Sequence, residues 1–310
     1  LYTSSMGRVL TYSPWTAYLK IADGCDNFCS YCAIPHIRGR YRERPLKDIV
    51  AEAENLIKTG VKEIVVIAQD TTQYGSKTNS SLKALIRSLN ALKGNFKFRV
   101  MYLYPSGIDR ELLETIRDCK KMYNYLEVPL QHVSDTVLKA MNRRYKEKDI
   151  YDLIKMIKDV FGEDYLLRTT VISSFPAEKK EDHELLKAFI EKGFFDYIGA
   201  FKYSKEESSA SFKMRAVPSK TADARFAEIE KATHECMEKR LERFVGKEVE
   251  VLYEGVDSEL KVPVGRCWNQ APEIDGITII TNLEGEKEGS ILKCRITSRE
   301  GTDFIADILR

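Results

Sequence analysis

The sequence has neither a long hydrophobic run nor a signal for export. Its densest apolar stretch is Ile64–Ala68, far shorter than the roughly 18 residues that a membrane span needs. Residues 1–10 contain neither the basic nor the apolar segment of a secretory signal peptide. We therefore expect a cytoplasmic protein that makes no membrane contact.

An excess of charge of one sign is also absent. The chain has 310 residues, and its 49 Lys and Arg balance 47 Asp and Glu to leave a formal charge of +2. This balance excludes a general attraction to nucleic acid, so any such binding must come from a local patch. Hydrophobic residues make up 43% of the chain and charged residues 31%, which is typical of a globular protein and excludes disorder.

Cysteines are few and irregularly spaced, and seven of them do not form the pattern of a secreted disulfide framework. Three of them, Cys25, Cys29 and Cys32, share one short motif after the first predicted strand. Three thiolates on such a loop can hold a cubane 4Fe–4S cluster and leave its fourth iron open to a small molecule. A zinc site completed by His36 is the alternative. The position of the loop at the carboxyl end of a barrel strand favours the cluster.

Short apolar runs alternate with amphipathic stretches through residues 18–244. The predicted strands are Tyr18–Ala22, Glu63–Ala68, Phe98–Tyr104, Tyr125–Leu130, Leu166–Ser173 and Tyr197–Tyr203. Helices are predicted from Pro45 to Gly60 and at Leu82–Leu92, Asp109–Cys119, Asp135–Met141, Asp149–Val160 and Glu181–Lys192. Six βα units in series predict an α/β fold with a (β/α)6 partial TIM-like barrel. A flat doubly wound sheet is the competing layout.

The pattern changes after a long predicted helix at about 221–244. Five short strands follow without any helix, at Glu248–Tyr253, Lys261–Gly265, Ile277–Thr281, Ile291–Thr297 and Phe304–Leu309. They predict a small all-β barrel of the OB-like kind with antiparallel strands. We expect three segments: a linker (1–17), the partial barrel with its connecting helix (18–244) and the small barrel (245–310).

The cysteine motif carries a family resemblance. Cys-x3-Cys-x-Tyr-Cys, ending at Tyr31 and Cys32, resembles the radical S-adenosylmethionine superfamily. Its continuation, Ala33-Ile34-Pro35 with Ile37-Arg38-Gly39, resembles the methylthiotransferases. Three stretches are similar to their RimO branch: AQDTTQYG at 68–75, PLQH at 129–132 and APEIDG at 271–276. The resemblance extends from about 18 to 309.

The resemblance implies a radical S-adenosylmethionine barrel followed by a TRAM domain. It implies a transferase that adds a methylthio group to the β-carbon of an aspartate in small-subunit ribosomal protein S-twelve. The implied cofactors are S-adenosylmethionine, which also supplies the methyl group, and a 4Fe–4S cluster that reduces it. We expect three residues to contact S-adenosylmethionine: Tyr31 beside the adenine, Arg168 at the carboxylate, and Gln69. An electron donor is an implied partner, and we expect a monomer.

Enzymes of this family carry a second 4Fe–4S cluster, used in sulfur delivery, on three cysteines of an N-terminal domain. This chain opens at Leu1 without an initiator methionine, so we expect that domain to be missing. The chain should then cleave S-adenosylmethionine without completing methylthiolation. The remaining cysteines are too dispersed to replace the triad and are predicted to be small hydrophobic residues: Cys119, Cys236, Cys267 and Cys294.

One loop departs from the family pattern. Where the family commonly has G-F-P-G-E-T after the fifth strand, this chain has Ser174-Phe175-Pro176-Ala177-Glu178-Lys179. Serine and alanine restrict the positive φ and the close backbone approach that glycine allows, so we expect a differently shaped loop. His132, at the end of the fourth strand, is predicted to be structural rather than a general base.

The sequence offers two surfaces for partners. Arg38, Arg40, Arg42 and Arg44 alternate, so an extended segment would present them as one basic strip beside the cysteine loop. The resemblance makes the small barrel the module that recognises S-twelve, and its many acidic residues suit a basic protein. Ribosomal RNA contact stays open, because OB-like barrels often bind oligonucleotides.

Two alternative functions remain at this point. The first keeps the chemistry and changes the substrate, giving a tRNA adenosine methylthiotransferase of the MiaB type. The second belongs to another class, a zinc-stabilised RNA-binding protein that uses the three cysteines and His36.

Overall fold

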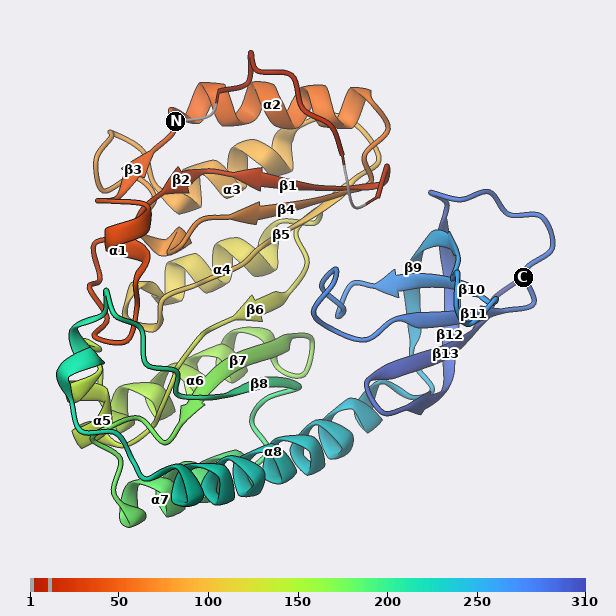
Figure 1. The fold of residues 1–310 in the computed structure, drawn as a ribbon. Helices are drawn as coiled ribbons and strands as arrows, with labels where there is room; N and C mark the ends of the chain where they lie inside the picture. Colours follow the sequence, from red (N-terminus) through yellow and green to blue (C-terminus); the bar gives the residue numbers. More distant parts are fainter. Residues whose placement is uncertain (1–2, 11–12) are drawn as a thin grey trace.

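Six parallel strands and the helices that cover them form the larger part of the molecule (Figure 1). The computed structural model describes residues 3–10 and 13–310. The strands are, in chain order, β1 (Thr16–Lys20), β4 (Glu63–Ile67), β5 (Lys97–Val100), β6 (Tyr125–Glu127), β7 (Leu166–Ser173) and β8 (Tyr197–Lys202). A short hairpin, β2 (Ala22–Asp23) with β3 (Arg42–Glu43), follows β1 and flanks the cysteine loop.

The strands are neighbours in the same order in which they follow along the chain. Parallel ladders join β1 to β4 and β4 to β5, and others join β6 to β7 and β7 to β8. Between the two groups, Phe98 N donates to Lys121 O at 2.9 Å, and Tyr123 N donates to Phe98 O at 2.8 Å. A doubly wound sheet requires the strand order to reverse. The flat alternative is therefore wrong, and the partial barrel is confirmed.

Helices cover the outer face of this barrel (Figure 1). They are α2 (Leu46–Lys58), α3 (Leu82–Ala91), α4 (Arg110–Asp118), α6 (Glu147–Phe161) and α7 (Lys180–Glu191), whereas the short helices α1 (Ile34–Ile37) and α5 (Asp135–Ala140) lie at the carboxyl ends of the strands. Helix α2 illustrates why they form: Pro45 is its N-cap, and Ile49, Ala53 and Leu56 bury one face. Single 3-10 turns lie at Thr71–Gln73, Pro105–Gly107, Ala210–Lys213 and Glu242–Phe244.

The long helix α8 (Ser219–Leu241) leads from the partial barrel to the small barrel. The small barrel is closed and consists of β9 (Glu248–Val256), β10 (Pro263–Cys267), β11 (Thr278–Thr281), β12 (Ile291–Glu300) and β13 (Asp303–Ile308). The predicted closed barrel is confirmed, but β11 and β13 pair in parallel. A ring of five strands cannot alternate direction at every junction, so an all-antiparallel arrangement was impossible.

The small barrel docks on the amino ends of the parallel strands, at the opposite end from α1 (Figure 1). A buried charge network joins the two parts. Glu63, the first residue of β4, accepts from Arg99 of β5 and pairs with Arg266 of β10, each at 2.6 Å. Arg266 also donates to Thr16 Oγ1 at 2.9 Å. Because all these groups are buried, the network closes the amino end of the barrel.

The stretch Ala271–Gly276 forms a second contact between the two parts. The side chain of Asp275 is buried within it and accepts from Arg168 of β7 at 2.5 Å and from Tyr125 of β6 at 2.6 Å. The adjacent Glu273 accepts from Tyr18 at 2.8 Å. From the sequence, this stretch was a family motif within the module that was expected to recognise S-twelve. In the structure its acidic side chains bond to the partial barrel.

The segment before β1 packs along α2. Ser4 N donates to Asp48 at 2.9 Å, and Arg8 pairs with Glu52 at 2.8 Å. Of the predicted linker at 1–17, residues 1–2 and 11–12 lie outside the described residues, and its last two residues belong to β1. Within residues 3–10 and 13–310, no helix combines the length and apolar character needed to cross a membrane.

Candidate active site

The cysteine loop lies at the carboxyl ends of the parallel strands. It begins at Gly24, which has a φ of +77°. A Cβ atom there would lie 2.3 Å from the carbonyl oxygen of Arg40. Only glycine fits this position, and the turn that it allows directs the chain from β2 back over the barrel mouth.

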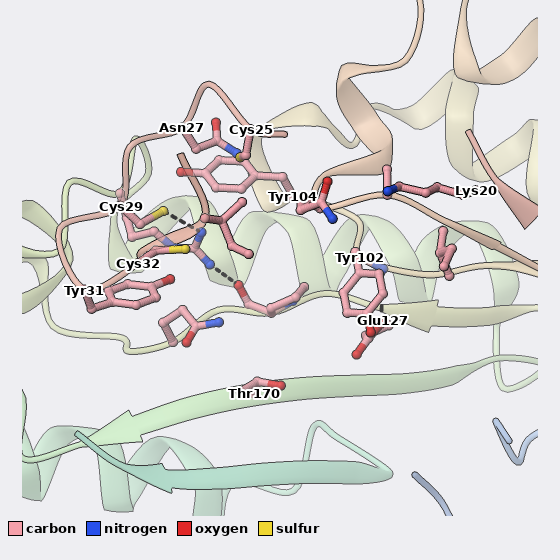
Figure 2. Close-up of a pocket in the computed structure, with 17 residues that line it drawn as sticks. Lys20, Cys25, Asn27, Cys29, Tyr31, Cys32, Tyr102, Tyr104, Glu127 and Thr170 are labelled. Atoms are coloured by element: carbon pink, nitrogen blue, oxygen red, sulfur yellow. Dashed lines mark hydrogen bonds between the residues drawn. The ribbon is translucent and has the colours of Figure 1, made fainter. Parts of the chain in front are cut away.

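All three cysteines of the motif line one cavity of about 480 Å³ (Figure 2). Cys25, Cys29 and Cys32 are half-buried and free. Tyr31 and Gln69, which we predicted to contact the cofactor, line the same cavity. The structure therefore brings together five of the six predicted site residues.

Neighbouring loops hold the cysteine loop in place. Asp70, buried after β4, accepts from Asn27 at 2.7 Å. Ser30 donates through its backbone to Met141 O at 3.0 Å, and Asn142 donates to Phe28 O at 2.8 Å. Asp70 belongs to the AQDTTQYG stretch, so part of that motif serves to position the cysteines.

Arg143 is a site residue that the sequence analysis missed. Its guanidinium donates to Cys29 Sγ at 3.5 Å and also donates to Pro129 O (Figure 2). It lies over the rings of Tyr104 and Tyr145, at 4.6 and 5.3 Å from their centroids. No sequence signal marked it, because Arg143 is 111 residues after Cys32 on an irregular loop.

Burial opposes ionisation of two of the three thiols. It raises the pKa of Cys25 to about 11 and also raises the pKa of Cys32. A metal that binds replaces these protons and needs the thiolate form. Among the described residues, no three His, Cys, Asp or Glu side chains gather tightly enough to hold a single ion. A cubane offers three separate iron corners, so three spaced thiols around one cavity fit a cluster.

The cavity also has features that suit S-adenosylmethionine. Gln69 Oε1 is buried and has no hydrogen-bond partner, so it is available to an N–H or O–H donor of a ligand. A volume of about 480 Å³ is within the range of cofactor sites. The aromatic ring of Tyr31 contributes to the wall.

Arg168 has a different position from the one we predicted. It is absent from the cavity lining and pairs with Asp275 at 2.5 Å and with Glu127 at 3.5 Å. Residue alternation in β7 directs Thr170 toward the cavity and leaves Arg168 one layer deeper, facing the small barrel. The expected contact with a cofactor carboxylate is therefore replaced by an ion pair with Asp275.

The part of the cavity opposite the cysteines is polar. Lys20 at the end of β1, Glu127 at the end of β6, Tyr102 and Thr170 line it (Figure 2). Glu127 accepts from Tyr102 N at 3.1 Å. Burial raises the pKa of Glu127, while Arg168 opposes that rise.

Backbone strain gathers around this cavity. Among the non-glycine residues with positive φ, five lie on loops at the carboxyl ends of the strands: Phe28, Tyr102, Gln131, Asn142 and Ser174. Such conformations persist only where surrounding contacts enforce them, and they cluster at active sites. The same holds here, since Tyr102 and Gln131 line the cavity.

The loop after β7 corrects one of our expectations. Ser174 adopts a φ of +63° although it is not glycine, and its N–H donates to Glu178 Oε2 at 2.7 Å. The serine therefore keeps the left-handed conformation that it was expected to prevent. His132 is buried and accepts from Ser134 N at 3.0 Å, while its Nε2 lies 3.5 Å from Glu178 Oε2, so its structural role stays a prediction.

Several other candidates lie outside the site. His36 is exposed on α1 and does not line the cavity, so the structure does not bring it to the three thiols. The four remaining cysteines are buried, as predicted. The prediction that four arginines form one exposed basic strip is wrong for Arg44. This residue is buried and pairs with Asp48 and Glu52, each at 2.6 Å.

Comparisons with known proteins agree with this geometry. A family model described as the radical SAM superfamily matches residues 19–189, and a TRAM domain model matches residues 245–309. The chain is similar to proteins named ribosomal protein uS12 methylthiotransferase RimO. The protein of that name from Aquifex aeolicus is 41% identical over 294 residues, or 94% of this chain and 68% of the relative. That from Dictyoglomus thermophilum is 39% identical over 100% of this chain and 71% of the relative.

A solved structure shares the fold of the partial barrel. It is the radical S-adenosylmethionine methyltransferase TsrM from Kitasatospora setae, determined with cobalamin and a 4Fe–4S cluster bound. The TM-score is 0.54 at 17% sequence identity, over 64% of this chain and 38% of that one.

Proposed function

The chain belongs to the radical S-adenosylmethionine superfamily and carries a TRAM domain, and on that premise we propose that it is a methylthiotransferase acting on ribosomal protein uS12. The reaction adds a methylthio group to the β-carbon of an aspartate. The cofactors are a 4Fe–4S cluster and S-adenosylmethionine. The relatives named above are all named as uS12 methylthiotransferases, which favours uS12 over tRNA as the substrate. The match to the radical SAM family overturns the alternative of a zinc-stabilised RNA-binding protein.

When bound, the reduced cluster and S-adenosylmethionine supply the radical chemistry that removes a hydrogen atom from an unactivated carbon. The residues of this chain prepare that step. Cys25, Cys29 and Cys32 hold the cluster through three thiolates. Tyr31 and Gln69 provide a wall and a free acceptor for S-adenosylmethionine.

One observation carries the proposal: three free, half-buried thiols line a single cavity that is large enough for a cofactor. Its test is anaerobic reconstitution of the chain with iron and sulfide. We expect about four irons per chain, in the stoichiometry of one cubane. With a reductant, the sample should cleave S-adenosylmethionine to 5′-deoxyadenosine and methionine.

Replacement of a ligand provides the decisive comparison. Cys29→Ala should lose both the bound iron and the cleavage. Cys119→Ala is the matched control, because Cys119 is also a free cysteine but is buried at the C-cap of α4. A Cys29→Ala protein that retains iron and cleavage, or a wild-type sample that takes up zinc and no iron, contradicts the proposal.

The surfaces that contact uS12 follow from the positions of the partial barrel and the TRAM domain. A target side chain must enter the cavity at the carboxyl ends of the strands, whereas the TRAM domain is docked on their amino ends. We propose that the TRAM domain contacts the uS12-containing particle away from the modified residue, through protein or RNA. Arg38, Arg40 and Arg42 are exposed beside the cavity and are better placed for the immediate surroundings of the target.

A further inference from the structure

Lys20 is a cation in the cavity to which neither the sequence nor the comparisons assign a role. It is the last residue of β1, and alternation along the strand places it on the same face as Thr16 and Tyr18. Those two side chains reach the small barrel, through Arg266 and Glu273 respectively. Of the three, Lys20 lies nearest the carboxyl end of the strand. Figure 2 shows its ammonium directed into the cavity from the side opposite the cysteines.

The ammonium of Lys20 has capacity for a ligand. It pairs with Asp23 Oδ1 at 2.7 Å, and Asp23 is not part of the cavity lining. Asp23 also has Arg42 at 3.6 Å, so it does not depend on Lys20 alone for a positive neighbour. An ammonium has three N–H donors, and one carboxylate oxygen does not use them all. The pair with Asp23 holds the lysine in place while leaving donors toward the cavity.

The other charged groups of the cavity are already engaged. Arg143 donates to Cys29 and to Pro129 O at the cysteine side. Glu127 accepts from Tyr102 N and pairs with Arg168 at 3.5 Å. Of the two cations that line the described cavity, Lys20 is therefore the one that can receive an anionic ligand on the side away from the cluster.

We propose that Lys20 is a carboxylate-binding residue and that it holds the side chain of the target aspartate. This inference rests on the proposed function, because that function makes an aspartate the substrate. A carboxylate paired with an ammonium places the adjacent β-carbon between Lys20 and the cysteine side of the cavity. The pairing also selects an acidic side chain, because a neutral analogue leaves the ammonium without its partner.

The test compares the binding of two substrates to the reconstituted chain with S-adenosylmethionine present, under anaerobic conditions. One is uS12, and the other is uS12 with asparagine in place of the target aspartate. We expect the wild-type chain to bind the aspartate form roughly ten-fold more tightly or better, as a charge-assisted hydrogen bond predicts. Lys20→Met should bind both forms equally, and Lys20→Arg should restore part of the preference.

Lys83→Met is the matched control, because Lys83 also pairs with acidic side chains but lies on the outer helices. It should keep the wild-type preference. Equal binding of the two forms by the wild type, binding of neither form, or an unchanged preference in Lys20→Met overturns the inference. Weaker binding of S-adenosylmethionine by Lys20→Met, with its uS12 preference intact, also overturns it and assigns Lys20 to the cofactor. Failure of the proposed function gives a different result, a wild-type chain without bound iron.

Discussion

Arg143 connects three loops of the site through one side chain. Its guanidinium contacts Cys29 of the cysteine loop, Pro129 after β6, and the rings of Tyr104 and Tyr145. A planar group with five donors can bond in several directions at once, which a lysine ammonium on a flexible stem does less well. Arg143 is therefore a positioning residue that also places positive charge beside a cluster ligand.

We predict that Arg143→Gln weakens cluster retention and lowers the reduction potential of the cluster. A hydrogen bond to a charged group is worth about 1.5 kcal/mol, which corresponds to roughly 60 mV for a one-electron couple. The potential should fall by up to that amount, because loss of a nearby positive charge disfavours the added electron. Iron analysis and a potentiometric titration followed by electron paramagnetic resonance measure both effects.

Arg144→Gln is the control for this change, since Arg144 is the exposed neighbour of Arg143. Its iron content and potential should equal those of the wild type. Equal shifts in the two variants would show that a general change of charge, rather than the contact with Cys29, is responsible.

At the scale of the element, the loop after β7 shows how contacts can override a residue preference. Ser174 keeps a φ of +63°, and Glu178, buried beneath it, accepts from Ser174 N at 2.7 Å and from Arg225 of α8 at 3.1 Å. A left-handed conformation costs a non-glycine residue roughly 1–2 kcal/mol. The buried carboxylate of Glu178 holds the loop in that conformation from two sides.

We predict that Ser174→Gly leaves the protein equally stable or stabilises it by up to about 1 kcal/mol. Relief of the left-handed strain is offset in part by the greater freedom of glycine in the unfolded chain. Ser174→Val should instead destabilise by about 1–2 kcal/mol, because a β-branched residue resists positive φ. Denaturant unfolding at neutral pH measures both changes.

Ser173→Gly provides the contrast, since Ser173 is the last residue of β7 and has an ordinary strand conformation. Glycine in a strand should cost roughly 0.5–1 kcal/mol. If Ser174→Gly destabilises as much as Ser173→Gly, the positive φ of Ser174 stores no strain.

At the scale of the whole molecule, the two barrels depend on buried charges at their interface. Glu63 is enclosed by Arg99 and Arg266. Burial pushes the pKa of Glu63 upward, but the two guanidinium groups outweigh burial and hold it below its ordinary value of about 4.5. The folded state therefore favours the ionised carboxylate. This contribution to stability is present above about pH 4.5 and is lost as the pH falls through the lower, folded-state pKa.

We predict that Glu63→Gln lowers the free energy of unfolding by about 3–5 kcal/mol at neutral pH, because it leaves two buried guanidinium groups without their shared partner. The variant should also lose part of the decline in stability that the wild type shows below pH 4.5. Urea unfolding at several pH values measures both effects. Glu250→Gln is the control, because Glu250 pairs with Lys97 at 3.6 Å while half exposed, and such a pair contributes about 1 kcal/mol or less.

The sequence alone determined the elements and the cysteine site. The six parallel strands and the five strands of the small barrel follow from runs of apolar residues, because burial on a strand or a helix imposes its period on the sequence. Cys25, Cys29, Cys32 and Tyr31 are neighbours in the chain, so the cavity that they line could be predicted from their spacing. Gln69 followed from its place in a family motif at a strand end.

Only the tertiary structure decided which distant residues the charged side chains contact. Arg168 was expected at the cofactor and instead bonds Asp275, 107 residues away, while Arg143 and Lys20 enter the cavity without any local signal. The choice of partner for a charged side chain depends on which layer of the barrel it occupies and on what closes each end. Residue order carries no direct record of either, because strand register sets the layer and the docking of the small barrel sets what closes the amino end.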